Sequence, residues 1–133
     1  MLSKKLIEFY DKLSSWENET VKECGLTLPQ MHTLEVIGSN EGIKMKEITE
    51  KLGIVTGTLT VMIDRLTKLD LVKRVVNRKD KRSFTIELTA KGKSLYQEHS
   101  HHHDILADEI TQELNEEEKA IFAKLLDKIL RRI

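Results

Sequence analysis

Residues 44–90 read KMKEITEKLGIVTGTLTVMIDRLTKLDLVKRVVNRKDKRSFTIELTA and decide the fold. Apolar residues recur at helical spacing over 44–52 and again over 56–69, which predicts two short helices joined by a tight turn at Gly53. Over 71–88 the apolar period changes to two on either side of a polar run, which predicts a β-hairpin. Two short helices followed by a basic hairpin predict a winged helix-turn-helix.

The segments on either side of this stretch are predicted to be helical. Residues 2–21 carry a narrow apolar stripe at spacings of four and three, made of Leu2, Leu6, Phe9, Leu13 and Trp16. A helix with so narrow a stripe needs a partner that buries it. Thr27 and Gln30 predict the capped start of a further helix, and residues 89–113 and 115–133 predict two more. The expected fold class is therefore mainly α with a small β-hairpin, with dimerisation helices at the N- and C-terminal ends.

Charge is unevenly distributed along a chain whose net charge is zero. Residues 40–93 carry thirteen Lys or Arg against seven acidic residues, a balance of +6. Residues 1–39 have a balance of −2 and residues 94–133 a balance of −4. A basic segment between acidic ends is typical of a protein in which one module meets phosphate.

Composition also narrows the class of protein. No stretch approaches the roughly 18–20 apolar residues needed to span a bilayer, and the N-terminus lacks a signal-peptide pattern. The one cysteine, Cys24, excludes an internal disulfide framework and fits a reducing compartment. We therefore expect a cytoplasmic protein with no membrane partner.

The second short helix and the hairpin together predict contacts with double-stranded DNA. A helix that enters the major groove needs small polar residues at its start, so that its backbone can approach the base edges. A basic hairpin suits the narrow, negative minor groove or its phosphate rims. The predicted contacts are Thr56, Gly57, Thr58, Thr60, Val61, Asp64, Arg65 and Lys68 on the helix, and Arg74, Arg78, Lys79, Asp80, Lys81 and Arg82 on the hairpin.

Three segments carry a resemblance to a known family: LTLPQMHTLEVI (residues 26–37), the stretch 45–92, and LNEEEKAIFAKLLDKI (residues 114–129). Over nearly its whole length the sequence resembles the MarR (multiple antibiotic resistance regulator) family. The family's Asp-x-Arg wing element, in which the Asp orients the Arg toward DNA, is matched by Asp80-Lys81-Arg82, and its helical Arg is matched by Arg65. The usual Ser or Thr before the recognition helix is here Val55, so Thr56 is expected to cap the helix and the helix to start a residue later.

The resemblance implies an organisation and a function. Residues 1–133 are expected to form a single MarR-type domain, with dimerisation helices at 1–24 and 90–133 and a winged helix-turn-helix DNA-binding lobe at 28–89. A homodimer of this kind binds a pseudo-palindromic operator, usually as a repressor, with ligand-modulated affinity.

The histidines are the candidate switch. His99 and His103 lie four residues apart, as paired zinc ligands on a helix often do, and His32 is a candidate third ligand. Zinc-responsive repressors of the family carry a similar His-rich stretch, and a His where His32 stands. The segment MHTLEVIG, with His99 and His103, also resembles the fatty-acid-synthesis repressors of the FabT type, which respond to acyl chains on carrier protein. Zinc, an acyl or small organic effector, and packed histidines with no ligand remain the alternatives, and no cofactor is required.

The sequence argues against two other classes of function. An enzyme is not expected, because the sequence has no Gly-rich phosphate loop, nucleophile elbow or HEXXH arrangement. A winged-helix protein-interaction module that has lost DNA contact predicts a neutral wing and a recognition helix without small polar residues. Neither feature is present in this sequence.

Overall fold

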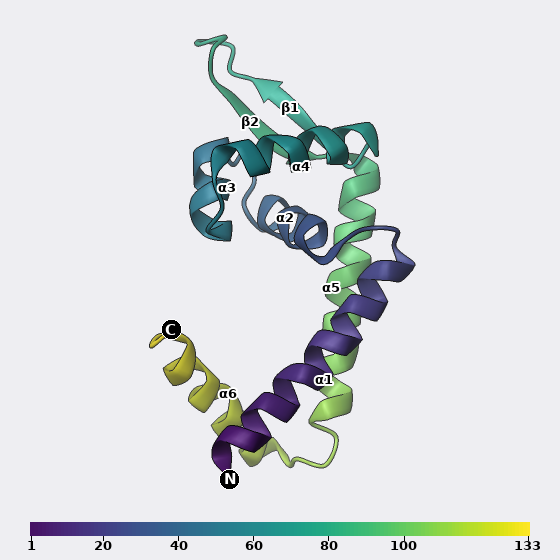
Figure 1. Ribbon diagram of the computed structural model, residues 1–133, viewed down its shortest axis with the longest axis vertical. Helices are drawn as coiled ribbons and strands as arrows, with labels where there is room; N and C mark the ends of the chain where they lie inside the picture. Colours follow the sequence, from purple (N-terminus) through teal and green to yellow (C-terminus); the bar gives the residue numbers. More distant parts are fainter. The chain divides into compact units, whose positions relative to one another are not determined.

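The computed structural model describes residues 1–133 and contains six helices and one two-stranded sheet (Figure 1). In chain order the elements are α1 (Leu2–Glu23), α2 (Leu28–Ser39), α3 (Met45–Leu52), α4 (Thr56–Lys68), β1 (Val72–Val76), β2 (Phe84–Leu88), α5 (Ala90–Ile110) and α6 (Glu116–Leu130). The mainly helical class with a small hairpin is confirmed. The chain divides into two compact units, Met1–Tyr96 and Gln97–Ile133, and the boundary falls within α5. None of the helices combines the length and the apolar character that a membrane span requires.

The first unit contains the whole buried core of the chain. Its helices α2, α3 and α4 pack together, and the hairpin rises from them (Figure 1). α2 begins where the sequence predicts, because Thr27 Oγ1 accepts from Gln30 N at 3.3 Å and Gln30 Oε1 accepts from Thr27 N at 3.0 Å. The buried apolar side chains are Val21, Leu26, Met31, Leu34, Ile37, Ile43, Ile48, Leu59, Ile63, Leu66, Leu71, Val72, Ile86 and Leu88.

The base of the hairpin is tied into this core. β1 and β2 pair antiparallel, with Val72 opposite Leu88 and Val76 opposite Phe84. Ile86 is fully buried, and its backbone N–H donates to the carbonyl of Ile43 at 2.8 Å. The strand ends near the core are therefore fixed by packing and by a third backbone segment, whereas the tip projects beyond them.

The start of α4 differs from the expectation. Val55 is the N-cap residue, with extended backbone, and Thr56 is the first helical residue. The prediction that Thr56 caps the helix was wrong, because the backbone enters the helix before Thr56. The N-cap has no side-chain hydrogen bond, so orphan N–H groups at the start of α4 are left without that internal acceptor.

The start of α5 is bonded to the turn between α4 and β1. Within that turn Asp70 has a φ of 60°, and its carbonyl accepts from Thr89 Oγ1 at 2.6 Å. The backbone N–H of Thr89 donates to the carbonyl of Leu71 at 3.0 Å. A Cβ at Gly92 would lie 2.0 Å from the Leu71 oxygen, so this close approach requires glycine. The first turn of α5 and the end of α4 are therefore held as one piece.

The second unit consists of the rest of α5 and all of α6. α5 ends at Ile110, before the predicted end, because Gln112 N and Leu114 N donate to carbonyls three residues back and tighten the chain into a turn. Asn115 and Glu118 then form the predicted capping box at the start of α6. No residue of α6 is buried, and most of its apolar side chains are exposed.

Candidate nucleic-acid interface

Helix α4 turns one face into the core and leaves the other free. Leu59, Ile63 and Leu66 are fully buried, and their spacing fixes the rotation of the helix about its axis. The predicted reading side chains lie on the remaining surface: Thr56, Gly57, Thr58, Val61, Asp64, Arg65 and Lys68 are exposed, and Thr60 is half-buried. The exposed surface of α4 therefore presents small residues at the start of the helix and basic residues toward its end.

Two side chains on this surface have different capacities for contact. Thr60 Oγ1 already donates to the carbonyl of Thr56 at 2.9 Å, so its hydroxyl proton is engaged inside the helix. Val61 is 70% exposed, which leaves a branched apolar group facing outward. An apolar side chain in this place suits contact with a thymine methyl group.

Gly57 has no reason inside the chain to be glycine. Its φ is not positive, and a Cβ built on it would meet nothing within 4 Å. Glycine in a helix is less favourable than alanine by about 1 kcal/mol. What the missing side chain does provide is room for the backbone to come close to another surface.

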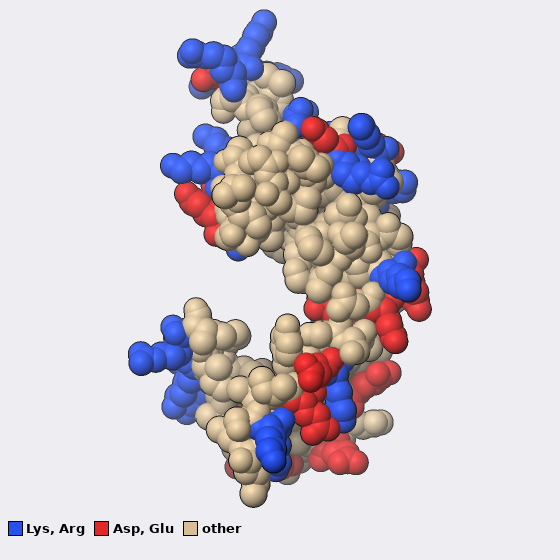
Figure 2. Space-filling view, in the orientation of Figure 1, with Lys and Arg blue, Asp and Glu red and all other residues tan.

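The hairpin tip gathers basic side chains, which Figure 2 shows projecting beyond the body of the first unit. Asp80 Oδ1 accepts from the backbone N of Arg82 at 3.0 Å and lies 3.5 Å from Arg82 Nε. The Arg82 side chain is 94% exposed. The exposed cations of the tip are Arg78, Lys79, Lys81 and Arg82.

Two residues predicted as separate DNA contacts are joined in the structure. Arg74 Nη2 donates to Asp64 Oδ1 at 3.0 Å, which links β1 to α4. The Arg74 guanidinium also lies 5.5 Å from the centre of the Phe84 ring. Sequence reasoning missed the pair because its members are ten residues apart, on a helix and a strand whose relative placement spacing does not reveal.

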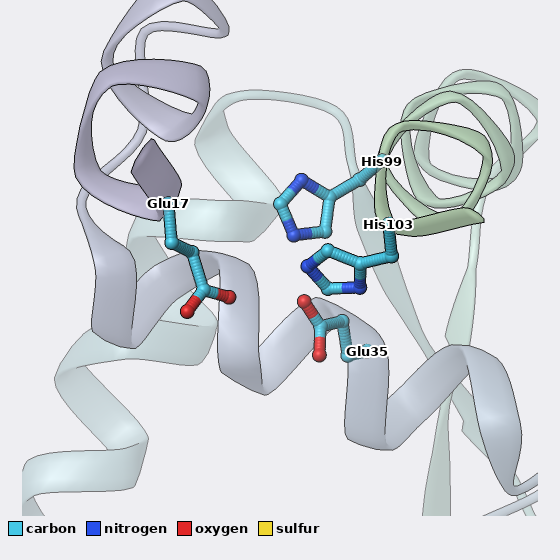
Figure 3. Close-up of side chains that lie close together, drawn as sticks. All are labelled: Glu17, Glu35, His99 and His103. Carbon is cyan, nitrogen blue, oxygen red and sulfur yellow. The ribbon is translucent and has the colours of Figure 1, made fainter. Parts of the chain in front are cut away.

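The second unit contains the histidine pair. His99 is 2% exposed, and its ring centroid lies 4.3 Å from that of His103 with the planes at 66° (Figure 3). The i, i+4 spacing on α5 thus brings the two imidazoles together, as the sequence predicts. His101 is exposed and lies outside this pair.

The first unit contains the third predicted ligand, His32, together with two carboxylates. His32 Nε2 lies 3.5 Å from Glu17 Oε1. Glu17 on α1 and Glu35 on α2 have carboxylate oxygens within 4.8 Å of one another and turn toward each other (Figure 3). These two acids could not be predicted from the sequence, since nothing in their spacing distinguishes them from other helical glutamates.

The comparisons with known proteins agree with this geometry. The model of the MarR family matches residues 26–84. The HTH-type transcriptional regulator MgrA of Staphylococcus aureus is 28% identical over 115 residues, which cover 86% of this chain and 77% of that protein. The reduced form of MarR from E. coli is 30% identical, with a TM-score of 0.77 over 98% of this chain and 96% of that one.

A further solved structure supports the fold alone. FabT of Streptococcus pneumoniae, solved in complex with DNA, superposes with a TM-score of 0.89 at 22% identity, covering 98% of this chain and 93% of that chain. Fold, identity and coverage agree with the likeness in residues 26–37, 45–92 and 114–129. The chain therefore belongs to the MarR family of winged helix-turn-helix transcription regulators.

Proposed function

We propose that this protein binds a pseudo-palindromic DNA operator as a homodimer and represses transcription. The observation that carries the proposal is the outward face of α4. Packing of Ile63 and its buried neighbours fixes the helix, so that Gly57 and the threonines at its start face out beside the basic hairpin. A solved structure of MarR names it the multiple antibiotic resistance repressor, and FabT and MepR have been solved with DNA.

The two halves of this surface have different tasks in the proposal. The start of α4 enters the major groove, where small side chains let the helix approach base edges. Arg65, farther along the helix, reaches bases or phosphates. The hairpin tip with Arg82 lies along the minor groove, where the phosphate potential is most negative.

The homodimer follows from the apolar side chains that one copy leaves uncovered. On α1 these are Leu2, Leu6, Ile7, Phe9 and Tyr10, and on α6 they are Ile121, Leu125, Leu126, Ile129, Leu130 and Ile133. So many exposed apolar side chains on two helices are typical of an interface that a second copy covers. A two-fold dimer would place two recognition helices about one helical turn of DNA, roughly 34 Å, apart.

The test is binding of fluorescent duplexes from the protein's own upstream region and from random sequence, measured by anisotropy across a salt series. We expect tighter binding to an operator-bearing duplex, weakening steeply as salt rises. Arg65→Ala and Arg82→Ala should each weaken binding by about 1–3 kcal/mol. Arg131→Ala, on the end of α6, is the matched control and should bind as the wild type does. Salt-dependent binding to no duplex at all would contradict the proposal.

A second candidate, zinc-responsive regulation of the same fold, is favoured by the paired imidazoles of His99 and His103. Two neutral imidazoles one helical turn apart provide two of the four ligands that Zn²⁺ prefers. The buried position of His99 limits competition from water at one of them. His32 is the third residue of the ligand set that the sequence predicts.

Zinc titration of the purified, chelator-treated protein by calorimetry, with and without operator, tests this candidate. We expect one ion per chain and a change in operator affinity on addition of zinc. His103→Ala should abolish binding, whereas His101→Ala removes an exposed imidazole from the same helix and should not. His32→Ala then tests the third predicted ligand. Equal effects of the two His variants, or no binding, would remove zinc and leave an acyl or small organic effector.

A further inference from the structure

The DNA-facing surface contains two aspartates, and each is bonded to an arginine. Asp80 and Arg82 belong to the wing motif and lie two residues apart. Asp64 and Arg74 come from different elements, with a 3.0 Å hydrogen bond between Oδ1 and Nη2. The second pair therefore joins the recognition helix to the wing, which the first cannot do.

The alternation of β1 explains why Arg74 meets α4. Val72, Arg74 and Val76 lie on one face of the strand, because successive side chains point to opposite faces. Val72 on that face is buried in the core. Arg74 is the next residue along it, at the point where the core ends and the outer surface of α4 begins, and there it meets Asp64.

A second contact restricts the guanidinium. Phe84, which packs against the core, lies on the neighbouring strand with its ring centre 5.5 Å from Arg74 Cζ. This distance lies within the range of a cation–π interaction. The ring and the carboxylate together limit the orientations that Arg74 can adopt, although its side chain is 45% exposed.

We propose that Asp64 is a positioning residue that holds Arg74 for contact with a DNA phosphate, and that it makes no contact with DNA itself. The inference rests on the proposed DNA-binding function. A guanidinium has five N–H donors, so the bond to Asp64 leaves others for a phosphate oxygen. In this arrangement the bond also fixes the angle between the wing and the recognition helix.

The sign of one substitution separates this role from simple electrostatics. A carboxylate on a phosphate-facing surface repels DNA, so Asp64→Asn should tighten binding if charge alone matters. If Asp64 acts through Arg74, the same substitution should weaken binding, because the arginine loses its fixed position. We expect about a five-fold loss of operator affinity, the upper range for an exposed ion pair.

The experiment compares wild type, Asp64→Asn, Arg74→Ala and the double variant by anisotropy on one operator duplex across a salt series. Glu50→Gln on α3 is the matched control, because it removes the same exposed charge at a distance from this pair. Asp64→Asn should weaken binding in the wild-type background but not in the Arg74→Ala background. Both single variants should also lower the slope of log affinity against log salt by about one, as loss of a phosphate contact does.

The outcomes are distinguishable. Failure of the wild type to bind any duplex overturns the proposed function. Binding by the wild type, with Asp64→Asn tightening it, leaving it unchanged, or weakening it equally in both backgrounds, overturns the positioning role alone. Circular dichroism and the oligomeric state confirm that each variant is folded, and an unchanged salt slope in Asp64→Asn indicates a purely structural effect and counts against the inference.

Discussion

The two units of the chain use the same kinds of apolar residue for opposite purposes. In the first unit Ile63 is fully buried, whereas in the second Ile129 is 53% exposed. Every buried apolar residue of the chain belongs to the first unit, and α6 buries none. The winged helix-turn-helix part of the first unit therefore buries its own core in a single copy, whereas α1 of the same unit leaves Leu2, Leu6 and Phe9 exposed. The uncovered side chains of the second unit support the proposed homodimer, in which a second copy covers them.

Ile129→Asp should have the largest effect, and it acts on the second unit. In the proposed dimer it buries an unpaired carboxylate, which costs about 4 kcal/mol and should lower the association constant roughly a thousandfold. Operator affinity should fall with it, since a monomer engages one half-site. Sedimentation velocity measures the association. Lys124→Asp, on the opposite face of α6, is the control, and a variant that remains dimeric at micromolar concentration would contradict the assignment of this face.

Ile63→Ala should have the next largest effect, on the first unit. Removing a fully buried side chain from a closed core lowers the free energy of unfolding by about 3 kcal/mol. Urea denaturation followed by circular dichroism measures the loss. Ile121→Ala, the same chemical change on exposed α6, should instead weaken association and leave this transition nearly unchanged. Equal losses of unfolding free energy in the two variants would break the contrast between the units.

Two matched substitutions of helix N-cap residues test the contrast between the units further, and each should cost about 1 kcal/mol of helix stability. Thr27→Ala removes the cap of α2 and should destabilise the first unit without changing the dimer constant. Asn115→Ala removes the equivalent cap of α6 and should weaken association, because a frayed helix presents its apolar face less well. Urea denaturation gives the free energy of unfolding of each variant, and sedimentation velocity gives its association constant. A loss of association in Thr27→Ala together with a loss of unfolding free energy in Asn115→Ala would contradict the contrast between the two units.

Gly57→Ala should have the smallest effect on stability, and with the opposite sign. The other five glycines adopt positive φ or lie against another group, but Gly57 does neither. Alanine should therefore raise the free energy of unfolding by about 0.5–1 kcal/mol. Operator affinity should fall all the same, because a methyl group then stands between helix and DNA. Thermal melts and anisotropy on the same sample test this, and a more stable variant that binds as well as wild type would show that close approach is not needed there.

The sequence predicted the parts of the fold that local patterns specify. The reciprocal pairs Thr27–Gln30 and Asn115–Glu118 mark helix starts because capping chemistry acts over three residues. The hairpin strands followed from a period of two. The predicted start of α4 was wrong by one residue. The prediction assumed that a capping side chain must precede the helix, but Val55 is the N-cap residue and no side chain caps the helix.

The candidate interface was predictable as a list of residues but not as an arrangement. The apolar face of α4 predicts that Arg65, on the other face, is exposed. The polar run between the two strands predicts that the hairpin cations are exposed. The bond between Asp64 and Arg74 depends on how far β1 extends past the core, which is a tertiary distance. The same limit hid the convergence of Glu17 and Glu35, whose helices meet only in the folded chain.

The anchoring of α5 has a mechanical consequence. Gly92 allows the helix to lie directly against Leu71, and Thr89 bonds to Asp70 and Leu71 in the turn that follows α4. Because hydrogen bonds and a close backbone contact join the start of α5 to the end of α4, we expect a displacement of one to move the other. An effector then needs only a difference in affinity between two positions of α5 to move the recognition helix. The size of that difference in affinity then determines how strongly the effector changes the position of the recognition helix.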